Sequence, residues 1–291
     1  MCQLAGVSRA GFYRSLEDKA PVVEEMEVRD VLQRICLAHR HYGSRRVGQM
    51  LRRDGLVVNR KRVQRLMRND NLLVVARRKF VVTTDSGHKL RVFPNLAKRL
   101  TVTAPNQLWV ADLTYVRLQN EFVYLAVVLD VYSRKVIGWA LGRGLQSSLV
   151  VRALTQAMTS REVRPGLVHH SDRGVQYASY EYVEQLEAHG IWPSMSRPGN
   201  PYDNAKCESF IRTLKREQLD GRVWTNLEEL EASIAEFIDG YYNQQRLHSA
   251  LEYLSPVEFE QQAPTGAGTS CLPAALSFPR HKDIYPDAID T

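Results

Sequence analysis

Three acidic residues lie in sequence surroundings that could bring their carboxylates together. Asp112 is inside the apolar run 108–115, where an unpaired carboxylate is costly to bury. Asp172 directly follows the short expected strand 166–171, and α/β sheets place active sites at the carboxyl ends of such strands. Glu208 lies in the first turns of an expected helix. Alone, each acid could be a turn, helix-cap or surface residue, but together they predict ligands for two Mg²⁺ ions and phosphoryl-transfer chemistry.

The elements expected in the second part of the chain form a mixed α/β sheet. Apolar runs bounded by turn residues predict three consecutive strands, then helices that alternate with two further strands. The expected strands are 108–118, 122–131, 135–141, 166–171 and 191–196, and the expected helices are 147–161, 180–189 and 204–219. Thr225 and Glu228 fit a capping box that starts one more helix. This order places all three acids within one sheet-and-helix core.

Two basic residues follow Glu208 on the same expected helix. At 3.6 residues per turn, Glu208, Arg212 and Lys215 share one face. The basic side chains could hold DNA phosphates beside the acids. Alternatively, Glu208 and Arg212 form an ordinary surface ion pair, which is worth a few tenths of a kcal/mol. Spacing alone leaves both interpretations open.

The net charge of +7 is divided unevenly along the chain. The first hundred residues carry +13 and the remainder carries −6, which indicates a polyanion-binding module joined to a different part. Within a helical region over residues 1–75, Asn59 is expected to cap a helix that has an apolar face. Lys61, Arg65 and Arg68 lie on the opposite face, which suits DNA. The alternative is a solvated surface helix.

These patterns divide the chain into four parts. We expect a helical DNA-binding region over 1–75, a basic linker over 76–107, a catalytic core over 108–260 and a disordered tail over 261–291. The four cysteines are scattered without a CxxC pair, which favours a reducing compartment. No apolar run approaches the ~20 residues that a membrane span needs. A cytoplasmic protein without a membrane partner is therefore expected.

Three acidic motifs resemble the DDE integrase and transposase superfamily, whose catalytic core is RNase H-like. These motifs occupy residues 109–115, 170–177 and 203–210. Thirty-five residues separate Asp172 from Glu208, which is the D-35-E spacing of that superfamily. The segment 42–71 is similar to an internal helix-turn-helix, and the closing segment 242–256 includes Tyr-Asn-Gln-Gln-Arg-Leu-His. Together they narrow the resemblance to the integrase-like insertion-sequence transposases of family three.

The resemblance implies roles for individual residues. Asp112, Asp172 and Glu208 would be the catalytic acids and would bind two Mg²⁺ ions, for which Mn²⁺ would substitute. Lys215 would contact DNA, because the family has a basic residue seven positions after its glutamate. The implied reaction is metal-dependent cleavage at insertion-sequence ends, followed by attack of the freed 3′-hydroxyl on another phosphodiester.

The resemblance also implies partners. They are duplex DNA of the transposon ends and of the target, and further copies of the chain assembled on that DNA in the bacterial nucleoid. Residues 1–13 look like the back half of a helix-turn-helix. Because the front part is often encoded in an upstream overlapping frame in this family, the upstream product is an expected fusion or partner.

Two other functions fit the sequence less well than transposition. A decayed transposase acting as a DNA-binding regulator fits less well, because the three acids and their spacing are intact. An RNase H-type nuclease fits less well because of the helix-turn-helix and the closing segment. Four other residues near the motifs could be mistaken for metal ligands. Asp130 is expected to be structural, and Asp203 is expected to cap the Glu208 helix. His169 and His170 have no further histidine or cysteine at the spacing of a zinc site.

Overall fold

The computed structural model describes residues 23–74, 91–197 and 204–262. The chain forms two compact units, one ending at Lys79 and the other starting at Phe80. In the described part of the chain, no helix is long and apolar enough to cross a membrane.

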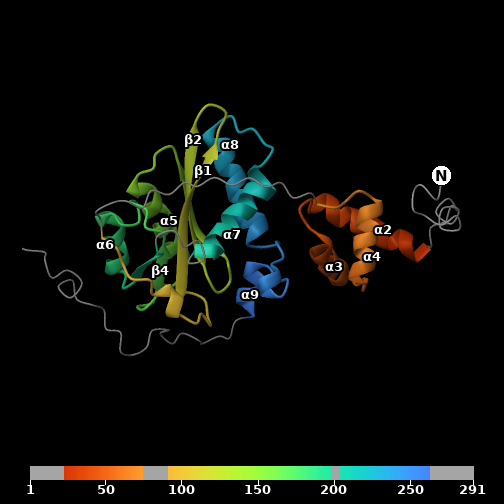
Figure 1. The fold of residues 1–291 in the computed structure, drawn as a ribbon, viewed down its shortest axis with the longest axis horizontal. Coiled ribbons are helices and arrows are strands. Elements are labelled where there is room, and N and C mark those ends of the chain that lie inside the picture. The colour runs from red at the N-terminus through yellow and green to blue at the C-terminus, as the bar shows by residue number, and fades with distance from the viewer. Residues whose placement is uncertain (1–22, 75–90, 198–203, 263–291) are drawn as a thin grey trace, which may run out of the picture. The chain divides into compact units, whose positions relative to one another are not determined.

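The first unit is a small helical domain (Figure 1). Its helices are α2 (Val23–Ala38), α3 (Ser44–Arg53) and α4 (Arg60–Asn69). The Asn59 side chain accepts a hydrogen bond of 2.8 Å from the Lys61 amide, which confirms the predicted cap of α4. Apolar side chains from all three helices are fully buried where the helices meet, and they are Leu32, Val47, Leu51, Val63, Leu66 and Met67.

The second unit contains a five-stranded mixed sheet with the order β3-β2-β1-β4-β5. The strands are β1 (Leu108–Arg117), β2 (Phe122–Asp130), β3 (Val136–Gly142), β4 (Val168–Ser171) and β5 (Trp192–Met195). The first three strands pair antiparallel through short turns, whereas β4 and β5 run parallel to β1. This architecture agrees with the mixed α/β sheet predicted from the sequence.

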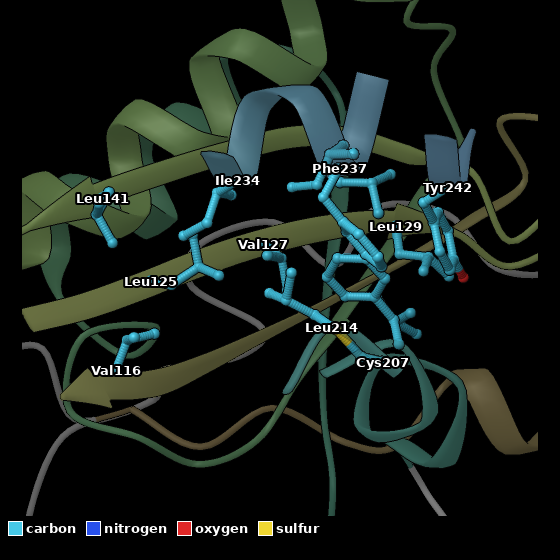
Figure 2. Packing of buried hydrophobic residues seen from close by; sticks show 14 of the residues in the cluster. Val116, Leu125, Val127, Leu129, Leu141, Cys207, Leu214, Ile234, Phe237 and Tyr242 are labelled. Atoms are coloured by element: carbon cyan, nitrogen blue, oxygen red, sulfur yellow. The ribbon is translucent and has the colours of Figure 1, made fainter. Parts of the chain in front are cut away.

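Helices cover both faces of the sheet (Figure 1). They are α5 (Ser147–Ser160) and α6 (Tyr180–Ala188) on one face, and α7 (Ala205–Leu214), η3 (Lys215–Leu219), α8 (Leu227–Ala235) and η4 (Glu236–Tyr242) on the other. Because side chains alternate along a strand, Leu108 and Val110 pack toward α7, whereas Trp109 and Ala111 pack toward α5. Figure 2 shows the α7 side, where Cys207 meets the sheet.

The cap of α8 differs from the prediction by one residue. The helix begins after Asn226, whose side chain accepts the Glu229 amide at 2.7 Å. The Glu229 carboxylate in turn accepts hydrogen bonds from the amide and hydroxyl of Thr225. The capping box expected for Thr225 and Glu228 is therefore wrong, because asparagine at the next position supplies the capping oxygen.

The segment that precedes the sheet packs against it, and a short helix is the last described element of the chain. In the segment that precedes η1 (Ala97–Arg99), Phe93 is buried, and the Leu96 amide donates to the Ser194 hydroxyl at 2.9 Å. This segment belongs to the expected linker, so its described part lies against the core. After η5 (Ser249–Leu251), α9 (Pro256–Gln261) is the last described helix. Most of the expected tail, residues 263–291, lies outside the described residues.

Candidate active site

Asp112, in the middle of β1, lies beside the carboxyl end of the neighbouring parallel strand β4, which Asp172 directly follows. The last pair between β1 and β4 joins Val110 to His170, and each acid is two residues beyond its member of that pair. Asp112 has the same strand parity as Val110, so its side chain leaves the sheet on the face that α7 covers. The pairing of β1 and β4 thus places two of the predicted acids close to the Glu208 helix.

The electrostatic surroundings of Asp112 connect the three acids. Burial and the nearby carboxylate of Asp172 raise the pKa of Asp112 to about 7, and Glu208 acts in the same direction. The hydrogen bond of 2.8 Å from the Leu113 amide and the charge of Lys215 oppose this shift without cancelling it. The metal-free site therefore disfavours the ionised form of Asp112, and a cation would relieve the repulsion.

Asp172 is held in a tight turn after β4. One carboxylate oxygen accepts the Gly174 amide at 2.9 Å. A Cβ atom on Gly174 would lie 2.9 Å from that same oxygen, so a larger residue would displace the carboxylate. Glycine two residues after the acid thus allows the backbone to close around it, while the Arg173 guanidinium donates to the Ser196 carbonyl of the neighbouring segment.

Glu208 lies in the first turn of α7 and is half-buried. Burial raises its pKa, and the charge of Arg212 one turn later lowers it. The charge of Arg212 thus acts on Glu208, and the two interpretations of their spacing, a surface ion pair and a phosphate contact, both stay open. Among the described residues, no three histidine, cysteine, aspartate or glutamate side chains are gathered closely enough to hold a metal ion.

Lys215 directly follows α7, and the charge of Asp112 acts on it. The α-helix ends at Leu214, and Lys215 begins the π-helical turn η3. Its ammonium nitrogen is 4.7 Å from the ring centroid of Tyr115 on β1. Burial lowers the pKa of Lys215, and the charge of Asp112 acts in the opposite direction. Tyr115, whose role the sequence did not indicate, thus supports a cation at the edge of the site.

The closing segment 242–256 contacts α7, η3 and β3 through its side chains. The Asn243 side chain accepts from the Val136 amide and donates to its carbonyl, at 3.0 and 2.9 Å. Arg246 forms two hydrogen bonds of 2.7 and 2.8 Å with Glu217 on η3, and both side chains are at most 5% exposed. Tyr242 packs edge-on against Phe210 of α7. The segment therefore supports the helix that carries Glu208.

The other acidic and histidine residues near the motifs, which were candidates for metal ligands, have structural partners. The carboxylate of Asp130 is fully buried and accepts the amides of Asn106 and Tyr132 at 2.7 and 2.8 Å. His170 lies between the hydroxyls of Ser194 and Ser196, at 2.8 and 3.0 Å. His169 contacts a tyrosine hydroxyl at 3.0 Å. Asp203 lies outside the described residues.

In the helical unit, the predicted basic face of α4 is exposed. Lys61, Arg65 and Arg68 are all exposed, opposite the buried apolar face. The Arg65 guanidinium, however, donates to the Glu25 carboxylate on α2 at 3.2 Å. Lys61 and Arg68 are therefore the stronger candidates for phosphate contacts, because the Arg65 guanidinium is already paired with a carboxylate of α2.

Comparisons with known proteins agree with this architecture. Residues 102–201 and 189–256 each match the integrase core domain, and residues 24–80 match an HTH-like domain. The insertion element IS600 uncharacterized 31 kDa protein of Shigella sonnei is 42% identical over 267 residues, which cover 90% of this chain and 98% of that protein. The transposase for insertion sequence element IS904 of Lactococcus lactis is 38% identical over 84% of this chain and 98% of its own length.

Two further similarities concern an Escherichia coli protein and a viral assembly. Transposase InsF for insertion sequence IS3A of strain K12 is 35% identical over 90% of this chain and 93% of its own length. A chain in the cryoEM structure of the simian T-cell lymphotropic virus intasome in complex with PP2A regulatory subunit B56 gamma is 16% identical. It has a TM-score of 0.48 and covers 81% of this chain and 75% of that chain.

The sheet order, the domain matches and the helical unit define an integrase-core protein with an RNase H-like fold and an HTH-like domain. Within that class, the chain belongs to the insertion-sequence transposases represented by those of IS904 and IS3A. The family and the fold predicted from the sequence are confirmed.

Proposed function

We propose that this transposase cleaves DNA at the ends of its insertion sequence and transfers the freed 3′-hydroxyl to target DNA. The observation that carries the proposal is the placement of Asp112, on β1, beside the carboxyl end of β4, which Asp172 follows, together with the electrostatic effect of Asp172 and Glu208 on Asp112. These are the three acids of the sequence motif, and they come from two strands and a helix that are distant in the sequence. DNA is the substrate, and the proposed assembly includes further copies of the chain and the upstream-frame product.

The three carboxylates fit a pair of divalent cations, Mg²⁺ or Mn²⁺. Their oxygens are hard ligands, and the pKa of Asp112 is raised by burial and then by Asp172 despite the nearby charge of Lys215, so further positive charge would stabilise the ionised carboxylates. Bound cations would stabilise negative charge on the attacking and leaving oxygens of the phosphodiester. Because the described carboxylates are not yet gathered around one point, we expect metal binding to draw them closer together.

The acids provide the direct test of this function. Asp172→Asn and Glu208→Gln each remove a hard ligand, and loss of several kcal/mol in the transition state lowers joining by on the order of 10²–10³-fold or more. Joining of labelled transposon ends is measured with Mn²⁺ or Mg²⁺, and DNA binding is measured separately. Glu231→Gln, on the exposed surface of α8, is the matched control and retains activity. Wild-type joining by either acid variant removes that residue from the site.

We propose that Lys215 positions a DNA phosphate beside the acids. Its cation–π contact with Tyr115 holds the ammonium near Asp112, and as a point charge it suits phosphate. Lys215→Ala is expected to lower joining roughly 10- to 100-fold, the effect of losing a charged hydrogen bond, while metal binding persists. Lys215→Arg recovers most of the activity. Arg216→Ala, one residue further on, is the control, and an equal loss in both variants contradicts a specific role for Lys215.

We propose that α4 contributes phosphate contacts to DNA binding. Replacing Lys61 and Arg68 by glutamine is expected to flatten the plot of log K against log salt by up to ~0.9 for each lost contact. Arg65→Gln has a smaller effect, because Arg65 already pairs with Glu25. The full chain is titrated with duplex DNA at several salt concentrations. Arg34→Gln, an exposed arginine paired with Asp30 on α2, is the control, and an unchanged slope in the double variant assigns α4 to solvated surface.

A further inference from the structure

Asn204 connects the two elements that carry Asp112 and Glu208. It lies at the N-cap position of α7, four residues before Glu208, and only 6% of it is exposed. Its side-chain nitrogen donates to the carbonyl oxygen of Ala111 at 2.9 Å. Because Ala111 directly precedes Asp112, one amide group fixes the start of the Glu208 helix against the Asp112 strand.

The side chain of Asn204 does not cap its own helix. Asparagine at an N-cap ordinarily accepts an amide of the first turn, as Asn59 and Asn226 do in α4 and α8. The Asn204 side chain makes no such bond, and its oxygen Oδ1 is buried without a hydrogen-bond partner among the described residues. Rotating the amide would place Oδ1 against the Ala111 carbonyl, so the observed orientation is the one that the contact requires.

Leaving a buried amide oxygen without a donor is costly, so it implies a donor that is present in the working state. A second buried polar atom near the acids is also unpartnered in the described part of the chain, namely the Tyr177 hydroxyl. The pKa of Tyr177 is raised by burial, then by Tyr182, Asp112 and Asp172, so the charges of the two acids act on this hydroxyl. Two segments that are distant in the sequence thus each hold a buried polar atom without a hydrogen-bond partner among the described residues.

We propose that Asn204 is a positioning residue of the metal site and that its Oδ1 accepts a hydrogen bond from a water molecule in the hydration shell of a divalent cation. The inference rests on the proposed function. Divalent cations such as Mg²⁺ retain several waters when few protein ligands bind them, and these waters can only donate to the protein. Oδ1 is an acceptor without a donor, whereas a phosphate oxygen could not satisfy it. The amide would thereby fix the helix of Glu208 and the hydration shell together.

The test measures metal affinity without DNA. The full chain is titrated with Mn²⁺, and the rise of its melting temperature above the metal-free value gives an apparent Kd. Loss of such a supporting contact typically weakens metal binding 10- to 100-fold, which is the effect expected for Asn204→Ala. Asn204→Asp keeps the size of the side chain but repels the Ala111 carbonyl, so it is also expected to weaken binding. Tighter Mn²⁺ binding by Asn204→Asp contradicts the proposal, because it indicates that the side chain at this position binds the cation directly and not through a water molecule.

Asn226→Ala is the matched control. It removes the cap of α8 and lowers the metal-free melting temperature, but it is expected to leave the apparent Kd for Mn²⁺ unchanged. A purely structural Asn204 would behave in the same way, and that result overturns the inference. Asp112→Asn separates this outcome from failure of the proposed function. If Asp112→Asn keeps the wild-type response to Mn²⁺, the metal site itself is wrong. If only Asn204→Ala keeps it, the proposed function stands and the role of Asn204 is wrong.

Discussion

Asp112→Asn is expected to abolish DNA joining and, at the same time, to make the metal-free chain more stable. The carboxylate is a proposed ligand, so its loss lowers joining by on the order of 10²–10³-fold or more. Without metal, the same carboxylate is a liability, because burial and the neighbouring Asp172 raise its pKa to about 7. Asparagine keeps an oxygen for the Leu113 amide but carries no charge to desolvate.

The gain in stability depends on pH with a definite sign. The folded state of the wild type holds the Asp112 proton up to about pH 7, whereas the unfolded chain releases it near its ordinary pKa of ~3.9. The stabilising effect of that proton is complete below the unfolded pKa and is lost as the pH rises through the folded pKa. The free energy of unfolding of Asp112→Asn should therefore exceed that of the wild type by an amount that grows by roughly 2–3 kcal/mol between pH 5 and pH 8.

Urea unfolding in EDTA at pH 5, 6, 7 and 8 measures this difference, and the joining assay measures the catalytic loss. Mn²⁺ is expected to stabilise the wild type and to have little effect on Asp112→Asn. Asp130→Asn is the control for catalysis, because Asp130 is a buried acid at the end of the next strand whose carboxylate binds backbone amides. It should join DNA in proportion to the fraction that is folded. A variant of Asp112 that is inactive but no more stable at pH 8 than at pH 5 contradicts the electrostatic account.

The sequence predicted what depends on local pattern. The Asn59 cap follows from a capping residue before an amphipathic segment, and the mixed sheet follows from the order of apolar runs. The acids could be selected because a carboxylate inside an apolar run is unusual and because their spacing resembles a known family. One local pattern failed, since two adjacent residues, Thr225 and Asn226, could both cap α8 and only contacts decide between them.

Other features depend on contacts between distant residues and could not be predicted. Nothing in the sequence pairs Arg65 with Glu25, so the shared role of that arginine emerged only from the fold. Asn204 is part of the motif around Glu208, but its bond to Ala111 spans 93 positions. The closing segment marked the family without indicating what its residues do. Their partners lie on α7, η3 and β3, where only the folded chain brings them together.

Removing one member of the Glu217–Arg246 pair is expected to destabilise the core strongly. The two side chains are 2% and 5% exposed and share two short hydrogen bonds. Truncating either partner leaves a buried charge without compensation, which typically costs about 3–5 kcal/mol. Glu217→Ala and Arg246→Ala should each lower the free energy of unfolding by about this amount. The exposed pair of Arg143 and Glu121 is the control, and Glu121→Ala should cost at most ~1 kcal/mol.

Loss of the Glu217–Arg246 pair is also expected to affect the proposed active site, because of where Glu217 lies. Glu217 lies on η3, directly after the helix that carries Glu208 and within the same π-helical turn as Lys215. Loss of the anchor should therefore increase hydrogen exchange in α7 and η3 more than in the α5 side of the sheet. Replacing both partners by apolar residues, Glu217→Leu with Arg246→Met, removes the uncompensated charge and should cost less than the sum of the two alanine variants. If Glu217→Ala is no more destabilising than Glu121→Ala, the buried pair does not anchor the helix, and its support must come from the apolar packing of Tyr242 and Phe210.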